Sequence, residues 1–515
     1  MTYFENIIIG AGPAGLQLGY FFQKNNDEYL IIEKDDCCGS FFKKYPHSKK
    51  LISINKVNTG STHRDFNFRH DWNSLLNDED FLFREYSKDF YPCSLDLYHY
   101  INDFQKKFNI NVSFNNHVRD INKNSDQYEI VLTNNKVYTC KNLIIASGFS
   151  KCKKDDVINK SSKEILHYSE YENNFFQNKK NLEEFTNKKI LIVGSGNSAY
   201  ELGNLLNEYC ASILLLGRPK NYSIVSHYAG DIRSVYYPFF DTFYLKSLNA
   251  IDTAQNTLYI HDYEDKFILK HEHGNYYANK NSCIFDKIIL CTGWKIDTSL
   301  FKFDVKLTNE NFPALNALYE SSNNKNLYFI GSLMHGADKN KSSGGFIHGF
   351  RYLIKFFHTL KYKRCQDEHI IRFTGDLSCY KNLATLIQER INTSSSLYQM
   401  FNVMCDVFYF NTDTKSIVYI KDLTLQYVVN HLKHIEKLNV LLLKYGEKTY
   451  DLRKIGAFNK DQPMFLHPEI LIINNNKQNF IEDKVVLEEE LFADFSSEEY
   501  FDKIHRKLMS CYLIF

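Results

Sequence analysis

Two stretches of the chain share one pattern of apolar and polar positions. In each, a short run of apolar residues ends in a turn of small residues, and apolar positions at helical spacing follow. The first run covers residues 7–9 and the second covers residues 189–193. Short apolar runs bounded by glycine are typical of buried parallel strands, so both stretches predict a strand, a tight turn and a helix.

The first turn has the spacing G-x-G-x-x-G. Gly10 permits the tight turn, Gly12 lets the backbone approach a pyrophosphate, and Gly15 lets the helix pack on the strand. The helix that starts at Pro13 and Ala14 aims free N–H groups and its positive dipole end at that pyrophosphate. The turn predicts a dinucleotide site. The alternative is an ordinary strand–helix–strand unit that binds no nucleotide.

The residues that follow the next strand distinguish the two expected nucleotides. The strand at residues 29–32 ends at Glu33, near the offset at which an acid binds a ribose hydroxyl. In the second unit Arg218 lies near the corresponding position, where an arginine accommodates a 2′-phosphate. The first site therefore suits FAD and the second suits NADPH, although Arg218 could equally be a solvated strand end. The second turn is spaced G-x-G-x-x-A and contains Gly194, Gly196, Asn197 and Ser198.

Later patterns complete the two expected units. Short strands at residues 137–140 and 142–145 precede a small-residue turn with Ser147 and Gly148, and a strand at residues 287–290 closes the second unit. A late strand at residues 326–330 ends at Gly331, and a helix is expected from about residue 346 to 362. In flavoproteins with two dinucleotide folds, such a strand, turn and helix cover the flavin.

These patterns predict an α/β protein with two Rossmann-like domains and a C-terminal α+β domain. The FAD domain is expected to be discontinuous, at residues 1–180 and 295–376, with an NADPH domain inserted at 187–294. Residues 377–515 mix helical and β-rich runs without a catalytic motif, which favours a capping or interaction domain. The polar stretch 151–187 is expected to be a connector, and the irregular segment 36–92 is of the kind that is usually functional.

Composition narrows the function classes. The chain has 515 residues and a formal net charge of +1, which gives no electrostatic case for nucleic acid or an anionic membrane. It contains no apolar run long enough to span a membrane and starts its first strand close to Met1, so a cytoplasmic location is expected. The twelve cysteines include no C-x-x-C pair, which argues against structural zinc, a disulfide framework and a dithiol reductase. We expect no metal site. The sequence does not decide whether the protein forms a homo-oligomer.

The glycine motifs resemble those of the flavin-containing monooxygenase superfamily. The resemblance rests on the first turn, on Gly196-Asn197-Ser198 of the second, and on Gly148, His167 and Tyr171, which follow that superfamily's fingerprint with a longer spacing. It implies that NADPH reduces FAD, that reduced flavin and O₂ form a C4a-hydroperoxide, and that one oxygen passes to a soft nucleophile. The expected substrate is an amine or thioether, with N-hydroxylation of an amine as one form of the reaction.

A second resemblance covers nearly the whole chain. It is to the FAD-dependent oxidoreductase domain-containing proteins, whose best-known animal member is an endoplasmic-reticulum flavoprotein linked to ER-associated degradation. In contrast to that protein, we expect neither a signal peptide nor an ER-retention tail from this sequence. The relation implies the alternative function, an NADPH-dependent flavin reductase or oxidase that acts on a thiol or a protein partner. The similar stretches are residues 45–56, 69–76, 227–233, 344–352 and 397–401.

The resemblance also implies site residues. Asn55 looks like the superfamily's active-site asparagine, although a turn residue before Lys56 is an equally good interpretation. Arg69 and Asp71 are assigned to catalysis as well, and a satisfied buried polar cluster is the alternative for them. The further cofactor contacts that we expect are Ser40, Phe41, His70, Trp72, Val118, Ser147, Gly345 and Phe346.

The sequence leaves the roles of two further groups of residues undecided. His335 and His348 either flank the ribityl chain of the flavin or are capping and core histidines. A carboxylate-bearing substrate would need a bidentate arginine, and nothing in the sequence chooses among the candidates Arg64, Arg69, Arg84 and Arg233.

The assignment of Arg218 makes a prediction about the nicotinamide cofactor. Changing Arg218→Ala removes one charge-assisted contact to the 2′-phosphate, which should weaken NADPH binding by about 1.5–3 kcal/mol and leave NADH binding unchanged. The measurement is the rate of flavin reduction by each cofactor in the wild type and the variant. If NADH and NADPH reduce the wild type equally well, Arg218 does not read the phosphate.

Overall fold

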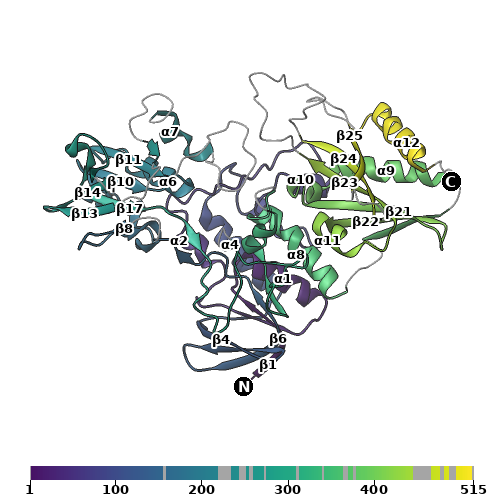
Figure 1. The fold of residues 1–515 in the computed structure, drawn as a ribbon, viewed down its shortest axis with the longest axis horizontal. Helices are drawn as coiled ribbons and strands as arrows, with labels where there is room; N and C mark the ends of the chain where they lie inside the picture. Colours follow the sequence, from purple (N-terminus) through teal and green to yellow (C-terminus); the bar gives the residue numbers. More distant parts are fainter. Residues whose placement is uncertain are drawn as a thin grey trace.

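The structure is a computed structural model whose described strands form five sheets, divided among three units of the chain (Figure 1). It describes residues 2–154, 158–217, 234–242, 251–253, 259–271, 274–308, 312–338, 342–363, 369–374, 378–444, 466–475, 481–486 and 495–512. Arg218, Arg233 and the similar stretch 227–233 therefore lie outside the described residues.

The first unit is built on a seven-stranded sheet in which β1 is central. β1 pairs in parallel with β2 and β6, and its last four residues are buried. Ile8 packs in the core that includes the long helices of this unit, while Ile7 and Ile9 pack in a second core with residues of β4 and β5. The order is β3-β2-β1-β6-β5-β4, with β19 beside β6. The strands are β1 (Thr2–Ile9), β2 (Tyr29–Ile32), β3 (Val112–Ser113), β4 (Val118–Asn124), β5 (Gln127–Leu132), β6 (Val137–Ile145) and β19 (Leu327–Phe329).

β6 corrects one expectation, since the two strands predicted at 137–140 and 142–145 are one continuous strand. Only Lys141 separates the two predicted strands, and Asn142 starts the second. Lys141 instead reaches Glu5 at 3.0 Å, and the Asn142 amide donates to Asn6 Oδ1 on the neighbouring strand at 3.0 Å. Both polar groups thus find partners across the sheet without ending the strand.

The long helices of the first unit, α1, α4 and α8, share one core on one face of this sheet. α1 (Pro13–Lys24) starts directly after the first glycine turn, and α8 (Ile347–Lys361), close to the predicted bounds of 346–362, packs against it. The segment 36–92 has only short helices, as its lack of periodicity predicted. The remaining helices are α2 (Ser40–Lys44), α3 (Arg64–Phe68), η1 (Phe83–Glu85), α4 (Ser94–Lys107) and η8 (Gly331–Ala337).

The second unit repeats the strand–turn–helix arrangement. Its five-stranded parallel sheet has the order β12-β11-β10-β17-β9, and a second sheet of short strands with the order β15-β14-β13-β8 lies beside it, with β16 on β14. The bounds are β9 (Leu166–His167), β10 (Lys189–Val193), β11 (Ser212–Gly217), β12 (Ile251–Thr253), β17 (Lys287–Leu290), β8 (Ile158–Asn159), β13 (Tyr259–Tyr263), β14 (Lys266–His271), β15 (Gly274–Asn275) and β16 (Ile284–Phe285). The helices are α5 (Lys179–Leu182), α6 (Asn197–Leu206), α7 (Tyr237–Phe240), η2 (Tyr168–Glu170), η3 (Phe175–Gln177), η4 (Glu183–Phe185), η5 (Ser234–Tyr236) and η7 (Lys280–Cys283).

The stretch 151–187 is more than the connector that its polar composition indicated. It supplies β9 at the edge of the second sheet, β8 to the smaller sheet, and β7 (Lys151–Cys152), which pairs with β18 (Trp294–Lys295). Strands of two residues are too short to show an alternating pattern, so periodicity could not reveal them.

The C-terminal unit is a six-stranded antiparallel sheet with the order β20-β22-β21-β23-β24-β25. One continuous cluster of buried apolar side chains runs from α1 through α8 into this sheet, and it includes Leu16, Leu353 and Leu441. The C-terminal unit therefore shares its core with the first unit. Its elements are β20 (Ile370–Thr374), β21 (Met404–Asn411), β22 (Ser416–Thr424), β23 (Lys437–Lys444), β24 (His467–Asn474), β25 (Ile481–Val486), α9 (Ser378–Thr393), α10 (Ser395–Gln399), α11 (Leu425–His431) and α12 (Glu498–Tyr512).

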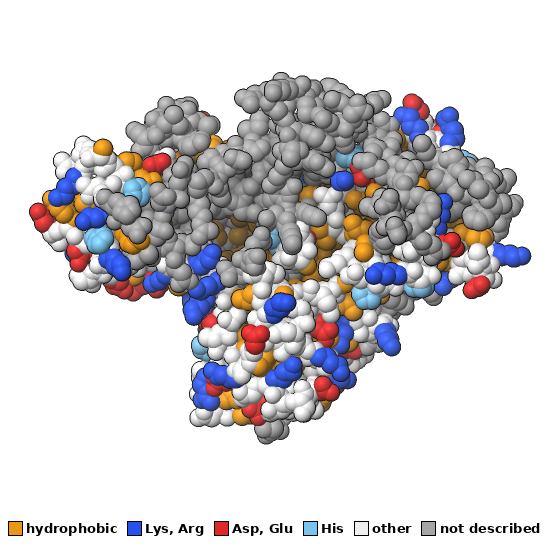
Figure 2. Space-filling model, viewed as in Figure 1, with side chains coloured by type: hydrophobic (Ala, Val, Ile, Leu, Met, Phe, Trp, Pro, Cys, Tyr) orange, Lys and Arg blue, Asp and Glu red, His pale blue; other side chains and the backbone are white. Residues whose placement is uncertain are grey.

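The surface carries charges of both signs. Basic and acidic side chains are interspersed among the described residues on the face shown in Figure 2, in keeping with the formal net charge of +1. In the part of the chain that the structure describes, no helix is both long and apolar enough to cross a membrane.

Candidate active site

A cavity of about 570 Å³ lies where the glycine turns of the first two units face each other. Gly12, Pro13 and Ala14 at the start of α1 line one side, and Asn197 and Ser198 at the start of α6 line the other. Both helices therefore point their free N–H groups and positive dipole ends toward one space, which favours bound phosphate groups.

The first turn fits a dinucleotide sterically. Gly10 has a φ of +108°, and a Cβ added at Gly15 would lie 2.0 Å from the Gly10 carbonyl oxygen, so the turn and the helix contact each other closely. A Cβ added at Gly12 would meet no atom within 4 Å, which leaves the space in front of the turn open. Gly331 closes on the same helix, because a Cβ there would lie 2.6 Å from the Ala14 Cβ.

Glu33 is held beneath the first turn. Its carboxylate accepts hydrogen bonds from the Ala11 N–H at 2.7 Å and the Asp35 N–H at 3.0 Å. The side chain is buried, and this burial raises the pKa of Glu33. Glu33 thus orients the backbone of the turn, and its contact with a ribose stays a prediction.

The second turn repeats this geometry. Gly194 has a φ of +135°, and a Cβ there would lie 2.3 Å from the Cys291 carbonyl oxygen at the end of β17. At Gly196, as at Gly12, an added Cβ would meet no atom within 4 Å. The two turns therefore present matched open positions to one cavity.

Aromatic rings form much of the cavity wall. Phe41 and Tyr45 lie 6.3 and 5.5 Å from Trp294, measured between ring centroids. On another part of the wall, Trp72 stacks on His348 with centroids 4.3 Å apart, and His348 stacks on Phe346 at 5.5 Å. Apolar rings of this kind suit the flat ring systems of flavin and nicotinamide.

Sequence reasoning missed a buried carboxylate in the wall. Glu201 on α6 is 2% exposed, and it accepts hydrogen bonds from the Tyr168 hydroxyl and the Ser48 N–H, both at 2.5 Å. Burial raises the pKa of Glu201. Glu201 lies one helical turn after the second glycine turn, and no local sequence pattern marks it as a functional residue. The wall residue Tyr45 also donates to the Ser169 carbonyl at 2.8 Å, so these contacts join segment 45–48 to the second unit.

The structure brings many of the predicted cofactor contacts together in this cavity. Those that line it are Gly12, Pro13, Ala14, Phe41, Trp72, Ser147, Gly148, Asn197, Ser198, Gly345 and Phe346. Gly10, Gly15, Gly194, Gly196 and Gly331 shape the turns beside it. Three predicted contacts lie elsewhere: Ser40 donates to Asp35, His70 packs between Phe66 and Tyr398, and Val118 is a core residue of β4.

The candidate catalytic residues Asn55 and Asp71 do not line the large cavity. The Asn55 amide donates to the Ser87 carbonyl at 2.8 Å, and the Asp71 carboxylate accepts N–H groups of Asn73 and Ser74 at 3.1 and 2.9 Å. Asn55 and Asp71 face each other across a short β-bridge. They border a separate cavity of about 120 Å³, which Arg64 and Arg84 also line.

The other candidates contact protein groups. Arg69 is buried and donates to backbone carbonyls of the C-terminal unit rather than toward the cavity. Arg64 pairs with Asp80 at 2.5 Å, and Arg84 lies 3.6 Å from Glu85. His335 pairs with Asp338 at 2.9 Å, which fits the capping alternative, and His348 belongs to the aromatic stack.

The fold and the paired glycine turns define a class of enzyme. Residues 7–331 match the family described as pyridine nucleotide-disulphide oxidoreductase, and the chain belongs to this family. This confirms the predicted α/β fold with Rossmann-type nucleotide binding, the oxidoreductase class and the cofactors FAD and NADPH.

Similar proteins agree with this class. The FAD-dependent oxidoreductase domain-containing protein 2 of Mus musculus is 32% identical over 81% of this chain, and the match covers 66% of that protein. The match to the Danio rerio protein of the same name covers 64% of it, at 31% identity over 78% of this chain. The chain thus spans about two thirds of the length of these curated relatives.

A solved structure supports the fold. The bacillithiol disulfide reductase of Staphylococcus aureus superposes with a TM-score of 0.53 at 20% identity, over 71% of this chain and 100% of that one.

The matched glycines predict a pair of separable defects. Gly12→Val should fold, because its Cβ meets open space, yet purify with little or no flavin, since the side chain enters the space of the pyrophosphate. Gly196→Val should keep its flavin and raise the KM for NADPH at least about tenfold. Flavin absorbance of the purified variants and NADPH kinetics measure the two effects. A folded Gly12→Val protein with full flavin content would contradict the assignment.

Proposed function

We propose that this protein is an NADPH-reduced flavin monooxygenase that transfers one oxygen atom to a soft nucleophile such as an amine or a thioether. The observation that carries the proposal is the cavity between the two glycine turns, with its lining of apolar and aromatic side chains. In the overall reaction, NADPH, a proton, O₂ and the substrate yield NADP⁺, water and the oxygenated product.

The residues of the cavity have distinct tasks in this proposal. The starts of α1 and α6 bind the two pyrophosphates, so that the redox-active rings meet in the aromatic part of the cavity. When bound, FAD supplies the capacity to accept a hydride from NADPH and to activate O₂. The rings of Phe41, Tyr45 and Trp294 exclude water, which would otherwise divert the activated oxygen to hydrogen peroxide.

In place of the catalytic roles first expected, we propose structural roles for Asn55 and Asp71. The Asn55 amide binds the Ser87 carbonyl, and the Asp71 carboxylate binds the Ser74 N–H of its own segment. A backbone bridge between Asn55 and Asp71 joins segments 53–56 and 71–74. Ser53 and Trp72 on these same segments line the large cavity. Loss of the Asn55 amide should therefore lower flavin reduction and oxygen transfer together, rather than separate them.

A reductase that acts on a thiol or disulfide is the second candidate. The similarity in fold to a bacillithiol disulfide reductase favours it, as does family membership. The sequence contains no C-x-x-C pair that could relay electrons from the flavin within this chain. A reductase of this kind would have to reduce its substrate directly at the flavin.

Isotopically labelled O₂ separates the two functions. Incubation with NADPH and a panel of amines and thioethers should place one labelled oxygen atom in a product and consume one NADPH for each product formed. The monooxygenase proposal fails if no substrate acquires label and NADPH electrons appear instead in a reduced disulfide.

A matched pair of phenylalanines tests the exclusion of water. Phe41 and Phe90 are 49% and 46% exposed, but only Phe41 is among the described residues that line the cavity. Phe41→Ala should raise the share of NADPH electrons released as hydrogen peroxide about twofold or more, a change of about 0.4 kcal/mol in the partition. Phe90→Ala should leave this share unchanged. Equal peroxide release from both variants would show that the Phe41 ring does not shield the reaction.

A further inference from the structure

A buried arginine of the first unit, Arg69, links the C-terminal unit to the cavity wall. The Arg69 guanidinium donates to the Ser394 carbonyl at 3.0 Å and the Ile391 carbonyl at 2.7 Å, where α9 ends and α10 begins. It also lies over the Tyr398 ring at 4.9 Å. Burial lowers the pKa of Arg69 to about 10, so the side chain keeps its charge at neutral pH.

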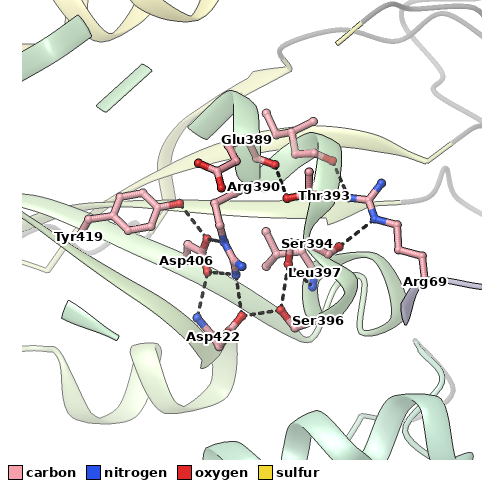
Figure 3. Close-up of polar contacts among 11 residues, drawn as sticks. Arg69, Glu389, Arg390, Thr393, Ser394, Ser396, Leu397, Asp406, Tyr419 and Asp422 are labelled. Carbon is pink, nitrogen blue, oxygen red and sulfur yellow. Dashed lines mark hydrogen bonds and ion pairs between the residues drawn. The ribbon is translucent and has the colours of Figure 1, made fainter. Parts of the chain in front are cut away.

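The carbonyls that accept hydrogen bonds from Arg69 lie at the junction of α9 and α10, where buried ion pairs hold the chain in place (Figure 3). Arg390 on α9 binds both carboxylate oxygens of Asp406 at 2.6 and 2.9 Å and also binds Asp422 at 2.6 Å. The Tyr419 hydroxyl donates to Asp406 at 2.8 Å, and Ser396 of α10 donates to Asp422. Burial alone would lower the pKa of Arg390, but the two carboxylates outweigh it and hold that pKa above its usual value.

The backbone of Arg69 continues the connection toward the cavity. Its carbonyl accepts the Trp72 indole N–H at 3.1 Å and an amide N–H of Gln399 from α10. Trp72 lines the cavity and stacks on His348, which stacks in turn on Phe346. The same carbonyl thus joins the C-terminal unit to a ring in the cavity wall.

A second buried arginine, on α8, binds the same segment of the first unit. Arg351 on α8 is fully buried and donates to the Phe68 and Ser74 carbonyls, both at 2.7 Å. Residues 68–74 are therefore bound by α8 at Phe68 and Ser74 and by the C-terminal unit at Arg69. Buried backbone carbonyls that lose such donors incur a desolvation cost, so this arrangement favours one position of the segment.

We propose that the C-terminal unit acts as a positioning element for the active site, and that Arg69 is the positioning residue through which it sets the place of Trp72 in the cavity wall. The proposal deepens the proposed function, and it rests on that function only in taking this cavity as the cofactor site. It assigns to residues beyond the second unit a part in cofactor or substrate placement. Arg69 acts through Trp72 and does not itself touch the reacting atoms.

The two tryptophans of the chain, Trp72 and Trp294, make the proposal measurable. In the full chain with its flavin and the background change Trp294→Phe, all tryptophan emission comes from Trp72. Arg69→Met should raise the acrylamide quenching constant of this emission about two- to tenfold, the range expected when a hydrogen-bonded position is lost. Arg69→Lys keeps a cationic donor on a long side chain, so Trp72 quenching should lie between the values of the wild type and Arg69→Met.

The control is Arg119→Met in the same background. Arg119 lies on β4, its side chain is 48% exposed, and it pairs with Asp120 at 2.8 Å, so its loss should leave Trp72 emission unchanged. Gln399→Met removes the second donor to the Arg69 carbonyl and should also raise the quenching constant of Trp72. If Arg69→Met does not fold, the comparison of Gln399→Met with the control tests the proposal. Quenching equal to the control in the folded variants would overturn the proposal. Since the resting protein is measured, the result stands whether or not oxygen transfer is found.

Discussion

The cofactor cavity depends on one constraint. The first glycine turn must pack closely against the helix that follows it and against the late glycine that follows β19. Gly15 must lie against the Gly10 carbonyl, Gly331 must lie against Ala14, and Glu33 must hold the Ala11 N–H from below. Only then does α1 point its free N–H groups into the cavity. The second unit meets the same requirement at Gly194 against the end of β17, so the two helix starts face one space.

The cavity wall between these helices depends on contacts made far away in the sequence. Segment 45–48 is joined to the second unit through Tyr168 and Glu201, and segment 68–74 is joined to α8 through Arg351 and to the C-terminal unit through Arg69. All three units therefore contribute to one cavity. This explains why an irregular segment, which has little regular secondary structure of its own, can form a defined wall.

The elements with strong local signals were predictable from the sequence. The two glycine turns and α8 follow from spacing and periodicity, and the turns lie beside the cavity as expected. Asn55 and Arg69 were assigned by family resemblance and residue type, which say nothing of where a side chain points. Their partners, the Ser87 carbonyl and the carbonyls near α10, are set by long-range packing. Glu201 was missed because a single acid inside an otherwise ordinary helix gives no local pattern.

The most direct test of this account is an anaerobic titration of the purified protein with NADPH, followed by the absorbance of its flavin. The account predicts that the protein purifies with about one FAD and that one equivalent of NADPH bleaches it, because both nucleotides bind at one cavity with their rings in contact. A protein that carries no flavin, or a bound flavin that NADPH leaves oxidised, would contradict it.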